Sequence, residues 1–106
     1  MTVVIRGGAG GVDALRDALR RDGTWSVISQ PGLGFETLAA SVRNNQLRTT
    51  TVRAILAVGG TLVPDLSGDG PPYHCELSGL TPEQLDSILK PAERNPVPLT
   101  KRWMPR

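Results

Sequence analysis

The stretch YHCELSGLTPEQ (residues 73–84) decides much of the predicted fold, because it joins a strand pattern directly to a helix start. Successive side chains of a strand point to opposite faces, so His74 and Glu76 share one face while Cys75 points toward the core. Thr81 then stands at an N-cap position, Pro82 at the first helical position, and Gln84 where a capping box needs it. The pattern predicts a strand beginning near residue 73 and a helix that ends near residue 90.

Apolar runs separated by glycine- and proline-rich breaks predict the other elements. These are strands over 2–6, 25–29 and 61–63, and helices over 12–22, 35–43 and from an N-cap within 49–51 to about 58. The order βαβααββα predicts a small two-layer α+β domain, with one sheet of about four strands covered by three to four helices. The helix between the first two strands makes them parallel if they are neighbours. Residues 1–90 form the predicted globular domain, and residues 91–106 form a Pro-rich basic tail that is extended unless Trp103 docks.

Composition narrows the class of protein. The chain has 106 residues, a net charge of +2, one cysteine and one histidine. An internal disulfide is therefore excluded, and a zinc site would need ligands from a second chain. The sequence has no export signal and no apolar run long enough to cross a membrane. We expect a soluble protein without a cofactor, located in the cytoplasm or delivered as part of a larger effector.

The glycine-rich stretch Gly7–Gly11 stands between the first strand and the first helix, where nucleotide-binding proteins cradle phosphates. Asp13 occupies the place of the third glycine in the dinucleotide pattern, and no Gly-Lys-Ser/Thr follows. A flexible connector is therefore favoured over a nucleotide-binding regulator.

His74 and Glu76 are the candidate catalytic residues, since a histidine beside a carboxylate can move protons near neutral pH. RNA cleavage without a metal also needs cationic groups on the phosphate, and arginine suits that contact. Arg6, Arg48 and Arg53 are the predicted phosphate-binding residues because they lie nearest the predicted sheet or its loops. The same residues also fit a solvated strand face without catalytic activity.

The chain from Trp25 onward resembles a C-terminal module of bacterial polymorphic toxins, and the resemblance covers about residues 25–98. It rests on WSVISQPG, TTTVRAILAVGGTLVP, YHCELSGLTPEQLDSIL and PAERNPVP. The resemblance implies a small toxin-like effector domain and favours a metal-independent nuclease, without identifying its substrate. Together with the His74–Glu76 pair and the arginines, it leads us to expect a ribonuclease with RNA as its partner. The alternative is a non-catalytic module, of interaction or immunity type, that binds a bacterial partner protein. Its contact residues would be Arg102, Trp103 and Arg106 in the basic tail.

Overall fold

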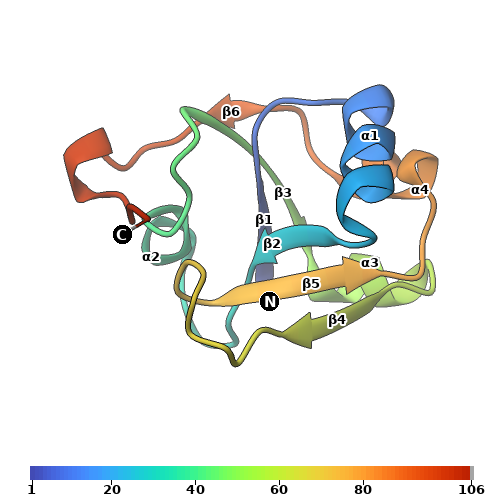
Figure 1. Ribbon diagram of the computed structural model, residues 1–106, viewed down its shortest axis with the longest axis horizontal. Helices are drawn as coiled ribbons and strands as arrows, with labels where there is room; N and C mark the ends of the chain where they lie inside the picture. The colour runs from blue at the N-terminus through green and yellow to red at the C-terminus, as the bar shows by residue number, and fades with distance from the viewer. Residues whose placement is uncertain (106) are drawn as a thin grey trace.

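The computed structural model of the chain describes residues 1–105, and its strands form one antiparallel sheet (Figure 1). The strands are β1 (Val3–Gly7), β2 (Trp25–Ile28), β3 (Gln46–Thr51), β4 (Thr61–Pro64), β5 (His74–Ser78) and β6 (Glu93–Arg94). In space they follow the order β4-β5-β2-β1-β3-β6. The mixed α+β class is confirmed, and the sheet has six strands where the sequence predicted about four.

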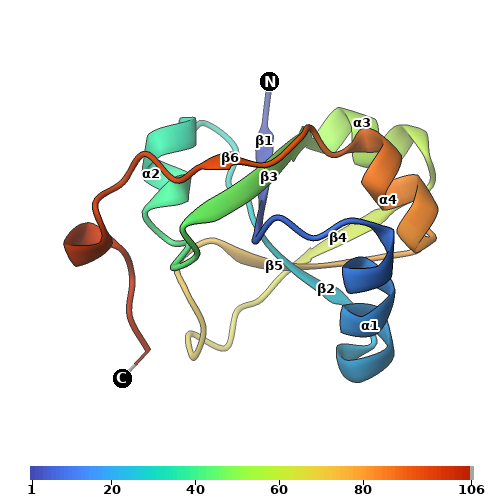
Figure 2. The ribbon, with the colours of Figure 1, turned by 90° about the horizontal axis from the view of Figure 1, so that it is seen from above.

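Four α-helices and one 3₁₀ turn accompany the sheet. They are α1 (Val12–Asp22), α2 (Phe35–Ala39), α3 (Val52–Ala57), α4 (Pro82–Ile88) and a 3₁₀ helix over Leu99–Lys101. Figure 2 shows α1, α3 and α4 gathered around one end of the sheet, with α2 and the C-terminal segment at the other end. Among the described residues, no helix has the length and apolar character that crossing a membrane requires.

The central strands are buried on both faces. Along β1, Val4 and Ile5 point in opposite directions and are 1% and 0% exposed. One face packs against α1, α3 and α4 in a core of Val4, Leu15, Ala18, Trp25, Val27, Ile55, Cys75, Leu77, Leu80, Leu85 and Leu89. The other face packs against α2 in a core of Ile5, Ile28, Leu38, Ala39, Val42 and Leu47. The two-layer prediction is thereby corrected: helices cover the sheet on two sides, because β1 and β2 carry Val4 and Val27 on one face and Ile5 and Ile28 on the other.

Helix ends follow the local signals in the sequence. Helix α1 spans the predicted residues and ends at Gly23, whose φ of 78° is the left-handed conformation that glycine adopts readily. Thr51 Oγ1 accepts from the backbone N of Ala54 and caps α3. Thr81 and Gln84 form the predicted capping box at α4, with reciprocal bonds of 3.1 and 2.8 Å. These predictions are confirmed.

Two predictions about the sheet are wrong. Strands β1 and β2 are neighbours but antiparallel, with Ile5 opposite Ile28, although a helix connects them. Residues 46–51 form β3, a long central strand paired with β1 through five residues, where the sequence pattern predicted only a loop and a helix cap. The threonine run serves both purposes, since β-branched residues suit a strand and the last of them, Thr51, caps the following helix. Helix α2 is also shorter than predicted and ends at Ala39.

The segment after residue 90 packs on the rest of the chain. Strand β6 pairs with β3, and the side chain of Asn95 is 3% exposed. Asn95 Nδ2 donates to the carbonyls of Ala39, Val42 and Asn44 at 3.3, 3.0 and 3.2 Å. The backbone N of Trp103 donates to Ala40 O at 2.7 Å. Trp103 therefore docks beside α2, which is the condition under which the sequence predicted an ordered segment.

Strand β5 separates its side chains as predicted. Cys75 and Leu77 are buried in the core beneath α1 and α4, while His74, Glu76 and Ser78 lie on the opposite face. Cys75 is 7% exposed, and burial raises the pKa of its thiol. A thiolate nucleophile is therefore disfavoured at this position.

Candidate active site

His74 is held by a carboxylate that follows the neighbouring strand. Its Nδ1 lies 2.9 Å from Oδ2 of Asp65, which comes directly after β4. The backbone N of Asp65 also donates to His74 O at 2.9 Å, so strand pairing aligns the two residues. The side chains of His74 and Asp65 are 14% and 26% exposed. The imidazole is thus fixed in orientation and largely shielded from water.

Asp65 is ionised over a wide pH range. The backbone N of Ser67 donates to Asp65 Oδ1 at 3.0 Å. That bond, followed by the bond with His74, lowers the pKa of Asp65 from 3.8 to about 2. An ionised carboxylate only accepts hydrogen bonds, so Nδ1 of His74 carries a proton and donates to it. In the neutral ring, Nε2 is then the free proton acceptor.

The lowered pKa of Asp65 predicts a pH-dependent contribution to stability. A carboxyl whose pKa is depressed on folding stabilises the protein above its unfolded pKa, and this contribution is lost as the pH falls through the folded pKa. We expect the advantage of wild type over Asp65→Asn, measured as the urea midpoint, to shrink between pH 5 and pH 2. Asp69→Asn is the matched control, since the Asp69 carboxylate accepts no hydrogen bond among residues 1–105. A constant difference between wild type and Asp65→Asn across this range would contradict the assignment.

An open cleft of about 400 Å³ lies beside His74 on the α2 side of the sheet. We call it the His74 cleft, and its lining residues are Ile5, Arg6, Gly7, Ser26, Ile28, Ser41, Val42, Arg43, Asn44, Pro71, His74 and Trp103. Three separate segments contribute basic residues to its lining: β1 contributes Arg6, the segment after α2 contributes Arg43, and β5 contributes His74. A cleft with one fixed imidazole and two arginines in its lining is suited to bind a phosphate ester.

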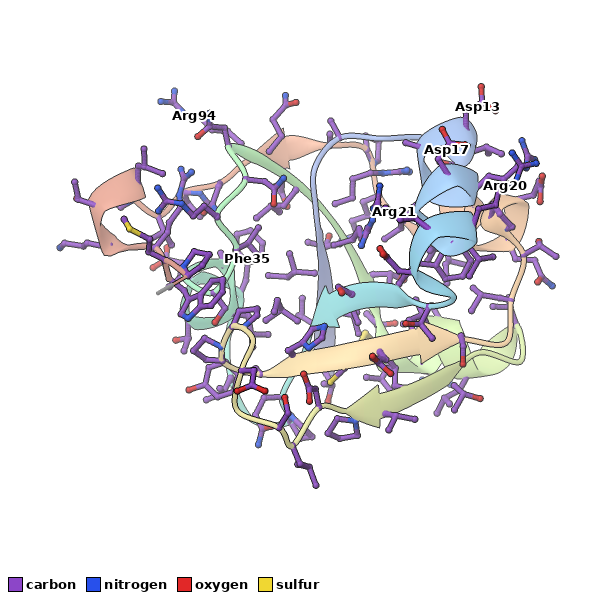
Figure 3. The ribbon with its side chains drawn as sticks, in the orientation of Figure 1. Asp13, Asp17, Arg20, Arg21, Phe35 and Arg94 are labelled. Carbon is purple, nitrogen blue, oxygen red and sulfur yellow. The ribbon has the colours of Figure 1, made fainter. Side chains whose placement is uncertain are left out.

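Arg6 reaches the His74 cleft because β1 and β2 separate beyond their single paired position. Its Nη1 donates to Ser26 O at 2.9 Å across the gap. Desolvation, followed by the nearby charge of Arg21, lowers the pKa of Arg6. Figure 3 shows Arg21 on the side of α1 nearer β1 and Arg20 on the far side. Arg6 has no carboxylate within ion-pair distance among the described residues, although the charge of Asp22 acts on it at longer range.

The opposite wall of the cleft is fixed by the C-terminal segment. Arg102 Nη1 donates to the carbonyls of Arg43 and Asn44 at 3.1 and 3.3 Å and to Asn45 Oδ1 at 2.9 Å. The Asn44 side chain packs over Gly7, where a Cβ would collide with Asn44 Oδ1. A glycine at position 7 therefore lets Asn44 lie close to β1 and form the cleft margin.

The structure separates the residues that the sequence grouped as a site. His74 and Arg6 line the His74 cleft, but Glu76 is exposed further along β5, opposite Ser26 and Val63, and does not line it. Arg53 is exposed on α3 and also lies outside the cleft.

Arg48 is 8% exposed and occupied by internal partners. It binds Asp86 Oδ1 at 2.7 Å and four backbone carbonyls, those of Gly10, Asp86, Leu89 and Lys90. Its guanidinium joins β3 to α4 and the glycine-rich loop, and is not free for a ligand.

Two of the predicted partner-binding residues near the C-terminus have different places in the structure. Arg102 is used to hold the cleft wall, and Trp103 lines the cleft itself. Arg106 lies outside the described residues.

Sequence reasoning missed Asp65, Ser41, Arg43 and Asn44. The spacing Asp65-Leu66-Ser67 is one that forms an Asx turn and could have marked Asp65 as a fixed carboxylate. Its approach to His74 follows from the pairing of β4 with β5, which the local sequence does not reveal.

Comparison with other proteins adds no identification. No protein-family model matches the chain, and neither curated proteins nor solved structures gave a match. Within residues 1–105, no three His, Cys, Asp or Glu side chains are grouped so that they could hold a metal ion.

Proposed function

We propose that this protein is a small toxin-like effector domain that cleaves RNA at the His74 cleft without a metal ion. The observation that carries the proposal is the convergence of a carboxylate-held imidazole with Arg6 and Arg43 around one open cleft. The resemblance to polymorphic toxin modules supports the same class of activity. Arginines suit the phosphate because their charge persists at any physiological pH and their donors match its oxygens.

In the proposed reaction, Nε2 of neutral His74 removes the proton from the ribose 2′-hydroxyl next to the scissile phosphate. The 2′-oxygen attacks phosphorus, and the bond from phosphorus to the 5′-oxygen breaks. Arg6 and Arg43 stabilise the extra negative charge on the phosphorane. Water in the open cleft protonates the departing 5′-oxygen, and the hydroxide so formed takes back the proton that His74 removed. The products are a 2′,3′-cyclic phosphate and a 5′-hydroxyl, and Asp65 stabilises the imidazolium that forms.

The test uses purified protein and a single-stranded RNA in the presence of excess EDTA. We expect cleavage to persist and the products to carry 2′,3′-cyclic phosphate ends. A matched substrate with one 2′-deoxyribose at the cleaved nucleotide should not be cut there, because it lacks the attacking hydroxyl. Intact RNA, or equal cleavage at the deoxy position, would contradict the proposal.

Binding of a partner protein is the second candidate function. Strand β4 lies at the edge of the sheet, and Val63 on this strand and Leu66 just after it are 53% and 92% exposed. An exposed edge strand offers unpaired backbone groups to another chain. If the protein is inert toward RNA and Leu66→Lys abolishes capture of a bacterial protein by the folded domain, the interaction function is favoured.

A further inference from the structure

A second cleft borders the His74 cleft. This second cleft has a volume of about 420 Å³ and lies between α2 and the C-terminal segment. We call it the Tyr73 cleft, and it is lined by Thr37, Ala40, Ser41, Pro72, Tyr73, Thr100, Lys101, Arg102 and Trp103. Ser41 and Trp103 line both clefts, so the two spaces meet at these residues.

The aromatic side chains of the protein are divided between the cores and the clefts. The chain has only two tryptophans, one tyrosine and one phenylalanine. Trp25 is 0% exposed, and Phe35, the first residue of α2, packs against the second core (Figure 3). The other two, Tyr73 and Trp103, both line the Tyr73 cleft, and Tyr73 is 40% exposed. Exposed aromatic rings beside a phosphate-binding cleft are the platforms on which unpaired bases stack.

The backbone holds Tyr73 in an uncommon conformation. Its φ is 63°, the left-handed region that a bulky residue rarely occupies. The backbone N of Ser29 donates to Tyr73 O at 3.0 Å, which ties this residue to the end of β2. The ring is therefore positioned by the same β2–β5 pairing that positions His74.

Charge selects the direction in which a nucleic acid strand would leave the His74 cleft. The Tyr73 cleft contains Lys101 and no acidic residue. A third cleft also has Tyr73 and Trp103 in its lining, but it contains Asp65 and Asp69 and, among the described residues, no basic one. Phosphates are repelled by carboxylates and attracted by ammonium groups. The path past Lys101 is thus favoured over the path past Asp69, and the two aromatic residues border both.

From these observations we infer that the substrate is single-stranded RNA that extends from the His74 cleft into the Tyr73 cleft. A base next to the scissile phosphate stacks on Trp103 or Tyr73, and the following phosphate contacts Lys101. This inference rests on the proposed function, because the scissile phosphate is placed at His74. Paired bases in a duplex are stacked within the helix and cannot enter between the rings, so duplex RNA is a poor substrate.

The test compares a dinucleotide with a tetranucleotide RNA containing the same cleaved step. We expect wild type to prefer the tetranucleotide. Tyr73→Asn removes the ring but keeps a residue type that accepts positive φ, and it should lower kcat/KM on the tetranucleotide about tenfold. Trp103→Leu should have a similar effect and Trp103→Phe should largely preserve the rate. The charge contact is tested separately. Lys101→Gln should reduce the slope of log KM against log salt concentration by about one unit. The control Arg20→Gln removes an exposed charge of α1 and should change neither this slope nor the rates of the aromatic variants.

Binding separates this inference from the proposed function. A labelled tetranucleotide is titrated into His74→Ala protein and into the same protein carrying Tyr73→Asn, with thermal unfolding confirming that both fold. If wild type cuts RNA but the aromatic variants neither weaken binding nor alter the preference for the longer substrate, the Tyr73 cleft is not the binding path. If the rings are needed for binding but wild type cuts nothing, the binding path stands and the ribonuclease proposal falls. Equal binding of duplex and single strand would also overturn the inference.

Discussion

Replacing His74 by alanine is expected to lower kcat/KM for RNA cleavage by about 10²- to 10⁴-fold, the usual contribution of a positioned acid or base. His74 is the only histidine of the chain, and its Nδ1 is committed to Asp65 at 2.9 Å. The loss should appear in single-turnover kcat, while the affinity for a labelled RNA changes little. The measurement is the cleavage of a fluorogenic tetranucleotide at a fixed enzyme excess.

The partner of His74 is identified by comparing two isosteric substitutions. Asp65→Asn preserves the size of the side chain but removes the negative charge that faces Nδ1 of His74. We therefore expect kcat to fall with little change in KM, and the pH profile of the reaction to change. Glu76→Gln tests the pairing suggested by strand alternation, and the exposed position of Glu76 predicts the smaller loss. A larger loss for Glu76→Gln than for Asp65→Asn would restore the sequence-based pairing and refute the Asp65 assignment. An unchanged rate in His74→Ala would remove the candidate site altogether.

Replacing Arg48 by alanine is expected to destabilise the fold by about 2–3 kcal/mol, less than for a fully buried ion pair because the Asp86 side chain is 35% exposed. The substitution would leave Asp86 and four backbone carbonyls without the arginine donor. The Leu89 carbonyl, whose bond is buried, cannot be fully satisfied by water instead. Urea unfolding followed by tryptophan fluorescence measures this change directly, since Trp25 is fully buried next to α1.

Two other arginine substitutions calibrate this result. Arg48→Lys retains the charge but not the forked donor geometry, so an intermediate loss is expected. Arg53→Ala removes an exposed arginine from α3 and should change the free energy of unfolding by no more than about 0.5 kcal/mol. A cost below about 1 kcal/mol for Arg48→Ala would show that the guanidinium is dispensable for folding. Arg48 would then return to the list of residues that could contact a phosphate.

Local signals predicted helix ends well because their partners are within four residues. Thr81 and Gln84 satisfy each other's backbone groups, and Gly23 ends α1 through a left-handed turn. Strand β3 was missed because its threonines also suit a helix cap, and only pairing with β1 decides between the two. Strand β6 has two residues, and its pairing with β3 lies far away in sequence. Both strands thus depend on contacts between residues far apart in the sequence, which a local pattern does not reveal.

In the candidate site, too, the local sequence predicts some features, while others depend on contacts between distant residues. The face on which His74 lies follows from strand alternation alone, and the structure agrees. Its partner Asp65 depends on the pairing of β4 with β5 across a nine-residue loop. Arg6 and Arg48 stand directly opposite each other on β1 and β3, yet one lines the cleft and the other bonds to α4. The sequence could show that arginines suit a phosphate contact. Only the packing of α4, which binds the Arg48 guanidinium, shows that Arg48 has a structural role and Arg6 does not share it.

The burial of Cys75 has a consequence for chemical labelling of this protein. The only native thiol faces the core with a raised pKa, so alkylating reagents should react with it slowly in the folded state. A cysteine introduced at Thr100, which is exposed and also lines the Tyr73 cleft, would then be the single fast-reacting position, without removal of Cys75. A fluorophore attached there would report RNA entering the Tyr73 cleft, and unfolding would be signalled separately by the sudden reactivity of Cys75.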